Sequence, residues 1–269
     1  MNRHTLGPRL ALPLVVALLG ACAAPTAAPP AGETKDRVTA SDQTEASKRA
    51  NVRLQLASAY FADGQLTTAL DEVKQAIVAD PKMSEAYNLR GLIYAGLGDE
   101  ALAEESFRRA LQLSPNDGSV MHNYGWYLCI QKRYNEAGAL FQQALALPQY
   151  RDVTRTLLAQ GVCEARAGQL AEAERTLQRA FALDSSNVSV ALNLSEVLFQ
   201  RGEYERARFY IRRVNAVPQQ ATAQSLWLAA RIEFRSGNAS SANEIGRQLL
   251  GRYPKSPEAS AFQQGKLGD

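Results

Sequence analysis

Histidine and cysteine are scarce in this chain, which limits the metal-binding and catalytic sites that it can build. The 269 residues include two histidines, His4 and His122, and three cysteines, Cys22, Cys129 and Cys163. No pair among them has the short spacing that is typical of metal-ligand motifs. His122 and Cys129 would lie two turns apart on one helix, about 10 Å along its axis, which is too far for a nucleophile–base hydrogen bond. The sequence therefore predicts no enzyme, no cofactor and no metal site.

An excess of charge of one sign is also missing. Lysine and arginine total 30 and aspartate and glutamate total 27, so the formal net charge is +3. Arg3 and Arg9 fall in a segment that we expect to be removed, which leaves 28 positive against 27 negative side chains, or about +1. Nucleic-acid binding needs a clustered basic face. We therefore expect no nucleic acid among the partners.

Long apolar runs are absent, and the one short run lies near the start of the chain. Residues 10–19 are apolar except for Pro13, follow a basic start and precede Gly20-Ala21-Cys22. Ten residues are too few to span a bilayer, and the pattern is typical of a secretory signal. A cysteine directly after Leu-Gly-Ala resembles a bacterial lipobox, in which the thiol is acylated. We predict a signal peptide over 1–21 and lipidation of Cys22, the alternative being an ordinary signal peptide with an incidental cysteine.

The segment after the cysteine has the composition of a tether. Residues 22–47 are rich in Ala, Pro and Thr and contain no aromatic residue, so they cannot bury enough apolar surface to offset their ordering entropy. We expect an acylated N-terminus and flexible tether here, with Ser41 or Asp42 capping the first helix. Ala23 follows Cys22 where Asp would signal inner-membrane retention, so by resemblance to lipoprotein sorting we predict lipid anchoring to the periplasmic face of the outer membrane. More than one acyl chain would make this anchor firm.

Residues 48–256 repeat with a period of about 34 residues, which is typical of stacked helical pairs. Units begin at residues 50, 84, 118, 154, 188 and 223. Small residues such as Gly91 and Ala103 would let two helices cross closely, with Phe107 beside the crossing. A glycine that can adopt positive φ recurs between the two helices of each unit, except in the third unit, where Lys132 takes its place. These glycines are Gly64, Gly98, Gly168, Gly202 and Gly237.

This pattern resembles the tetratricopeptide repeat. The resemblance implies an all-α fold, a right-handed superhelix or solenoid of six helix-turn-helix repeats over 48–256. One unit cannot bury its apolar face, whereas stacked units form a continuous core. Residues 257–269 are expected to form a C-terminal cap and tail. A helical bundle without repeats is the alternative.

The repeat frame also assigns faces to the first helix of each unit. Trp126 and Cys129 lie one and four residues after Gly125, the close-crossing position, so they share a face that Gly125 does not. In this repeat family that face lines the concave groove. We predict a groove that is apolar in its N-terminal half and suited to an amphipathic helix; the alternative is that the array itself or the tether covers it. The predicted groove residues are Leu54, Ser58, Phe61, Asn88, Leu92, His122, Trp126 and Leu158.

Cys129 and Cys163 lie on the first helices of neighbouring repeats. The expected compartment is oxidising and permits a disulfide, but two buried free thiols remain the alternative. Their frame positions differ by two, so one is expected to point to the groove and the other to the side. A bridge requires Cα atoms within about 7 Å. It would close a loop of about 34 residues and stabilise the fold by roughly 3 kcal/mol in the chain-entropy model.

Three strings carry a more specific resemblance: HNYGWYLCIQKRYNEA in the third repeat, LPQYRD after it, and GVCEARAG in the fourth. They resemble the PilF/PilW family of type IV pilus biogenesis lipoproteins, over essentially the whole mature chain. The signature residues are Asn123, Tyr124, Gly125, Trp126, Cys129 and Cys163. The resemblance implies an outer-membrane pilotin that binds the secretin subunit and promotes its localisation and multimerisation, and we expect a monomer. The alternatives are a general periplasmic scaffold for outer-membrane assembly or cell-wall hydrolases, or pilus stabilisation without a role in secretin assembly.

Overall fold

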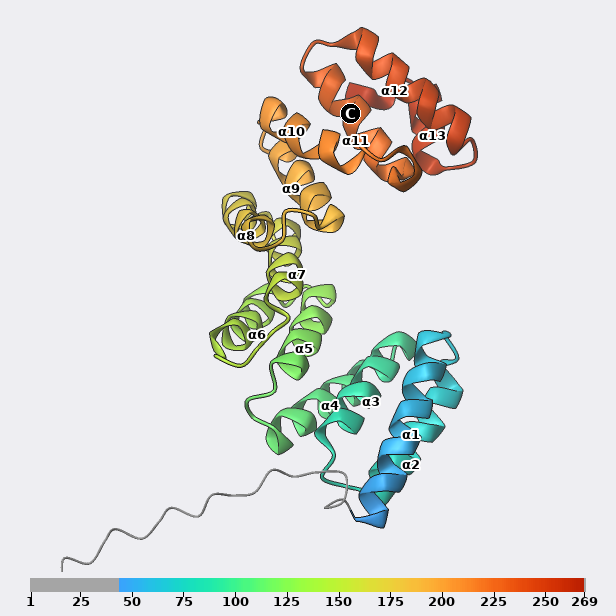
Figure 1. The fold of residues 1–269 in the computed structure, drawn as a ribbon, viewed down its shortest axis with the longest axis vertical. Helices are drawn as coiled ribbons and strands as arrows, with labels where there is room; N and C mark the ends of the chain where they lie inside the picture. Colours follow the sequence, from blue (N-terminus) through green and yellow to red (C-terminus); the bar gives the residue numbers. More distant parts are fainter. Residues whose placement is uncertain (1–43, 269) are drawn as a thin grey trace, which may run out of the picture. The chain divides into compact units, whose positions relative to one another are not determined.

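The computed structural model describes residues 44–268, and this part of the chain is helical without any strand (Figure 1). No helix within it combines the length and the apolar character needed to cross a membrane. Cys22 and most of the predicted tether lie outside the described residues. The helices are α1 Glu45–Ala62, α2 Leu66–Ala79, α3 Ser84–Leu97, α4 Glu100–Leu113, α5 Gly118–Ile130, α6 Tyr134–Ala146, α7 Val153–Arg166, α8 Leu170–Leu183, α9 Val188–Gln200, α10 Tyr204–Val214, α11 Ala223–Arg235, α12 Ala239–Arg252 and α13 Pro257–Gln263, with short 3₁₀ helices at Pro218–Gln220 and Lys266–Gly268.

The first twelve helices form six consecutive pairs, from α1/α2 to α11/α12 (Figure 1). The second helix of each pair also packs against the first helix of the next pair, so each repeat contacts its neighbours along the chain. The predicted all-α solenoid of six repeats is confirmed. The first repeat begins earlier than predicted, because the Thr44 hydroxyl accepts the backbone N–H of Ser47 and caps a longer α1. Thr44 therefore takes the capping role expected of Ser41 or Asp42.

The turn inside each repeat depends on one residue with left-handed backbone geometry. The five predicted glycines adopt φ values between 73° and 84°. Lys132 occupies the same position of the third repeat with φ 62°, and it is the one non-glycine residue with positive φ among residues 44–268. The turn geometry is therefore kept in the third repeat, although a Cβ makes it less favourable there.

Close helix crossings inside the repeats explain the small residues of the pattern. A Cβ atom at Gly91 would lie 2.8 Å from Phe107, and one at Gly125 would lie 2.9 Å from Phe141. Both phenylalanines are fully buried. The glycine on the first helix therefore makes space for an aromatic ring of the second helix, and any larger residue would force the pair apart.

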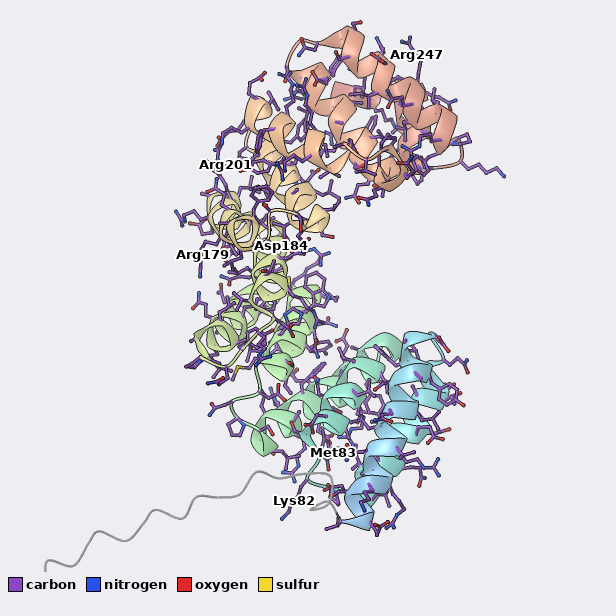
Figure 2. All side chains as sticks on the ribbon, viewed as in Figure 1. Lys82, Met83, Arg179, Asp184, Arg201 and Arg247 are labelled. Carbon is purple, nitrogen blue, oxygen red and sulfur yellow. A yellow bond between two sulfur atoms is a disulfide. The ribbon has the colours of Figure 1, made fainter. Side chains whose placement is uncertain are left out.

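The two ends of the array differ in how well they are covered. At the C-terminal end α13 packs on the last repeat, where Phe262 fills the space beside Gly246 and Ala259 is buried. At the N-terminal end α1 leaves Val52 64% exposed and Leu56 37% exposed. Charged side chains occur on several repeats, for example Arg179 on α8 and Arg247 on α12 (Figure 2).

Candidate functional site

The predicted groove residues come from α1, α3, α5 and α7, the first helices of the first four repeats. Most of them are half-buried and Ser58 is exposed. Leu54 and Phe61 pack against the core of the first repeat, while Leu92 and Trp126 pack against the core around α4 and α5. These apolar side chains are therefore anchored by the core and keep part of their surface exposed.

His122 does not belong to this exposed face, and its assignment to the groove was wrong. It is 5% exposed, and its Nδ1 atom lies 2.9 Å from the Thr156 hydroxyl on α7. Burial lowers the pKa of His122 to about 4; Arg155 adds to this shift and Asp152 opposes it. The imidazole is therefore neutral at pH 7. It is covered because α7 of the next repeat packs over this side of α5.

Trp126 keeps part of its ring accessible beside a cationic group. The guanidinium carbon of Arg166 lies 5.1 Å from the Trp126 ring centroid. Three residues earlier on α5, the Asn123 side-chain amide donates to Asn88 Oδ1 at 3.2 Å and links α5 to α3. Arg166 was not predicted. Arg166 lies 40 residues after Trp126. The repeat frame aligns residues about 34 positions apart, so it does not predict this contact.

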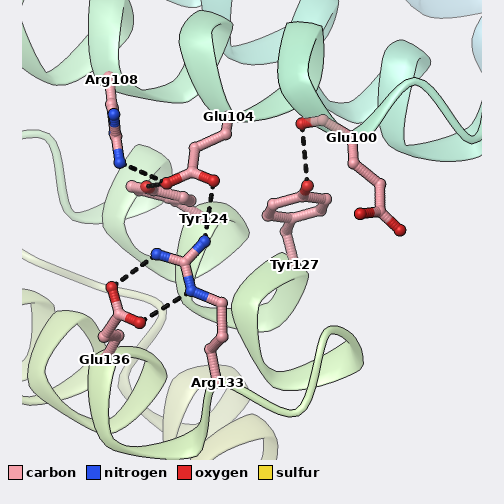
Figure 3. A network of polar contacts seen from close by, with 7 residues as sticks. All are labelled: Glu100, Glu104, Arg108, Tyr124, Tyr127, Arg133 and Glu136. Carbon is pink, nitrogen blue, oxygen red and sulfur yellow. Dashed lines mark hydrogen bonds and ion pairs between the residues drawn. The ribbon is translucent and has the colours of Figure 1, made fainter.

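Two signature-region tyrosines attach the third repeat to the second (Figure 3). The Tyr124 hydroxyl donates to Glu104 at 3.0 Å, and the Tyr127 hydroxyl donates to the backbone carbonyl of Glu100 at 3.0 Å. The Tyr124 ring also stacks on Phe107, with 5.3 Å between the ring centroids. Each tyrosine therefore packs its ring in the core and satisfies its hydroxyl on α4.

Glu104 collects further contacts at this junction (Figure 3). Arg108 pairs with it at 2.6 Å and Arg133 at 2.8 Å, and Arg133 also pairs with Glu136 at 2.6 Å. The hydrogen bond from Arg133 is the main reason that the pKa of Glu104 is lowered, and burial opposes it. These groups are engaged with one another, so the network positions the third repeat on the second and does not present a free acid or base.

The structure joins Cys129 of α5 and Cys163 of α7 in a disulfide, with Cα atoms 5.8 Å apart. Both residues are buried, 1% and 3% exposed, within the core that connects the repeats. The prediction that one of them points to the groove was wrong, because both sulfurs meet between the two helices. A disulfide sulfur has no thiolate to offer as a nucleophile. Within residues 44–268, no group of three or more His, Cys, Asp or Glu residues is placed to hold a metal ion.

Comparison with known proteins agrees with this geometry. The tetratricopeptide repeat family matches residues 54–118, 118–147 and 164–232. The type IV pilus assembly protein PilF of Pseudomonas aeruginosa is 28% identical over 213 residues, which cover 79% of this chain and 84% of that protein. A crystal structure of PilW, described as a widely conserved type IV pilus biogenesis factor, superposes with a TM-score of 0.75 at 31% identity and covers 80% of this chain and 98% of PilW. A solved structure of P. aeruginosa PilF gives a TM-score of 0.72 at 26% identity, covering 82% of this chain and all of that one.

The fold and these matches define a tetratricopeptide repeat protein. More specifically, the chain belongs to the PilF/PilW family of type IV pilus biogenesis proteins.

Proposed function

We propose that this protein is a non-catalytic outer-membrane lipoprotein that binds the secretin subunit of a type IV pilus and promotes its outer-membrane localisation and multimerisation. Membership of the PilF/PilW family carries the proposal, because it places the chain in type IV pilus biogenesis. Its relative PilF is a type IV pilus assembly protein, and PilW is a type IV pilus biogenesis factor. An acylated Cys22 would supply the membrane address, and the residues between Cys22 and α1 would let the repeats reach a partner.

The N-terminal repeats offer the surface that best suits an apolar partner segment. Leu54, Ser58 and Phe61 are spaced by four and three residues, so they share one face of α1. Leu54 and Phe61 are half-buried and Ser58 is exposed between them, while Val52 and Leu56 expose further apolar area at the end of the array. An amphipathic or extended apolar segment of the secretin subunit would bury this surface.

Ser58→Arg tests this surface without disturbing the core, because Ser58 is exposed and its hydroxyl donates to the Leu54 carbonyl of its own helix at 2.8 Å. We expect co-purification of the secretin subunit to fall about tenfold, because a long charged side chain would be buried against an apolar partner. The matched control is Val78→Arg on α2, where the native side chain is 76% exposed on a second helix.

Leu54→Asp combined with Phe61→Asp is the stronger perturbation. Both residues support the core of the first repeat, so circular dichroism must first show that the variant is folded. If Ser58→Arg and the folded double variant both retain the secretin subunit, another surface of the protein binds it.

The role of Cys22 in membrane targeting is tested by measuring the amount of SDS-resistant secretin multimer in membrane fractions. The strains compared are wild type, a deletion strain and Cys22→Ser. We expect only monomer in the deletion strain and multimers in the wrong membrane in Cys22→Ser. If multimers persist in the outer membrane of the deletion strain, the protein stabilises pili or acts as a general scaffold instead.

A further inference from the structure

Gly138 lies inside α6 at a position where packing does not require glycine. A Cβ atom built on Gly138 would meet no atom within 4 Å, whereas one built on Gly125 would clash with Phe141 at 2.9 Å. Glycine inside a helix destabilises it relative to alanine. Neither backbone geometry nor core packing therefore requires glycine at this position. A larger side chain here would fill the open space beside α6.

That space is a hollow of about 310 Å³ lined by α6, α7 and the start of α8. On α7, Gln160 and Glu164 are four residues apart and share the face that lines it. Leu158 of the predicted groove lies two positions from Gln160, or about 160° around the helix, so the hollow opens on a different side of the array. Its lining is polar and partly acidic and includes no lysine, arginine or histidine among the described residues: Tyr134, Asn135, Gln142, Gln160, Glu164, Gln169 and Glu172 are its polar members.

Two buried acceptor atoms on residues that line the hollow have no hydrogen-bond partner in the described part of the chain. Gln160 is 7% exposed, and its Nε2 atom donates to Glu164 Oε1 at 2.7 Å. A carboxylate only accepts, so this bond fixes the amide with its NH₂ group toward Glu164. Gln160 Oε1 and Glu164 Oε2 are then both buried and unpartnered. Buried polar atoms without partners are rare in folded proteins, because each forfeits its hydration.

The charges around the hollow show which kind of donor it suits. Glu172 already pairs with Arg175 at 3.0 Å. Glu164 has its bond from Gln160 but no ion pair with any described residue. A hydroxyl or amide ligand would satisfy the two oxygens but would leave the Glu164 charge uncompensated. An ammonium group supplies three N–H donors and the opposite charge together.

We infer that this hollow binds an ammonium group, carried either by a lysine side chain of a protein partner or by a free polyamine. The ammonium donates to Gln160 Oε1 and Glu164 Oε2, and its aliphatic stem lies beside Gly138 and the Tyr134 ring. The site is separate from the predicted groove. It can therefore be present whether or not the groove binds a secretin subunit.

The test is an NMR titration of the ¹⁵N-labelled full chain, following the Gln160 side-chain amide. The probes are Nα-acetyl-lysine amide, putrescine and the neutral Nα-acetyl-norleucine amide. We expect saturable shifts with at least one cationic probe and binding about tenfold weaker for the norleucine compound, which lacks the donor and the charge. Stronger binding of the lysine compound would indicate a partner side chain, and stronger binding of putrescine a free polyamine.

Gly138→Leu fills the hollow and should weaken binding of the cationic probe about tenfold without lowering the melting temperature, since leucine is the better helix former. Its matched control is Gly251→Leu on α12, where a Cβ also meets no atom within 4 Å, and this variant should bind as wild type does. Glu164→Gln should also weaken binding while keeping the side-chain volume. Absence of a saturable Gln160 shift with both cationic probes, or equal affinity of Gly138→Leu and wild type, would overturn the inference.

Discussion

Acidification from pH 7 to pH 5 is expected to destabilise the protein through His122. The folded-state pKa of this imidazole is about 4, below its ordinary value of 6.5, chiefly because the ring is buried and secondarily because Arg155 is near. As pH falls, the unfolded chain therefore takes up a proton at about pH 6.5, while the folded protein remains unprotonated until about pH 4. The unfolded state binds more protons in this window, so the stability present above pH 6.5 is lost as pH falls toward 4.

The size of the effect follows from the two pKa values. Proton linkage with values of 6.5 and about 4 lowers the free energy of unfolding by about 2 kcal/mol between pH 7 and pH 5. Well below pH 4 the loss would approach about 3 kcal/mol, since each unit of pKa difference corresponds to about 1.4 kcal/mol. Domains are commonly stable by only about 5–15 kcal/mol, so this single side chain should visibly shift the urea midpoint.

The assay compares urea unfolding of wild type and His122→Gln at pH 7 and pH 5. Glutamine can still hydrogen-bond to Thr156 but does not titrate. The difference between the two proteins therefore removes the contribution of carboxylates such as Glu104 and Asp184, whose pKa values are lowered in the fold. In a chain that begins at Cys22, His122 is the one remaining histidine, so NMR can titrate it directly. A measured pKa of about 6 or higher, or the same pH dependence in both proteins, would refute the reasoning.

Three further predictions use the same unfolding measurement. Cys129→Ala combined with Cys163→Ala should lower the free energy of unfolding by about 3–4 kcal/mol, because the disulfide closes a loop of 34 residues. Reductant should destabilise the wild-type protein to the same extent. A loss below about 1 kcal/mol would mean that packing alone holds the two repeats together. Lys132→Gly should raise stability by about 0.5–1 kcal/mol, because it relieves the backbone φ of 62°, and a decrease would contradict that account. Tyr124→Phe should lower stability by about 1 kcal/mol through loss of the hydrogen bond to Glu104, and an unchanged midpoint would show that this bond contributes nothing.

The repeat frame predicted the starts of five repeats to within one residue. Helices begin at Ser84, Gly118, Val153, Val188 and Ala223, against predicted unit starts of 84, 118, 154, 188 and 223. This agreement arises because each unit reuses the same small and large residues at one helix crossing. The first repeat starts at Glu45, earlier than the predicted residue 50. The first turn of α1 is polar and is stabilised by the Thr44 cap. It therefore lacks the buried apolar positions from which the repeat start was predicted.

Faces were harder to predict than elements. The predicted groove residues Leu54, Phe61, Leu92 and Trp126 are half-buried on the first helices, and their role in binding a partner stays a prediction. His122 was assigned to the same face by the same frame, yet it is buried against the next repeat. The hollow beside Gly138 had no sequence signal, because a glycine inside a helix does not reveal whether packing or open space requires it.

The sequence alone determined the number of repeats, the left-handed turn positions and the pairing of small with large residues inside each repeat. These depend on helix periodicity and on contacts between the two helices of one unit, which recur about every 34 residues. Only the tertiary structure decided how one repeat sits on the next. The contacts His122–Thr156 and Cys129–Cys163 each join residues 34 apart, whereas the equivalent glycines of these repeats, Gly125 and Gly161, are 36 apart. At these contacts the first helices of neighbouring repeats therefore do not pair equivalent repeat positions. The packing of unlike side chains sets how one helix is rotated against the next, and the repeat pattern does not encode that rotation.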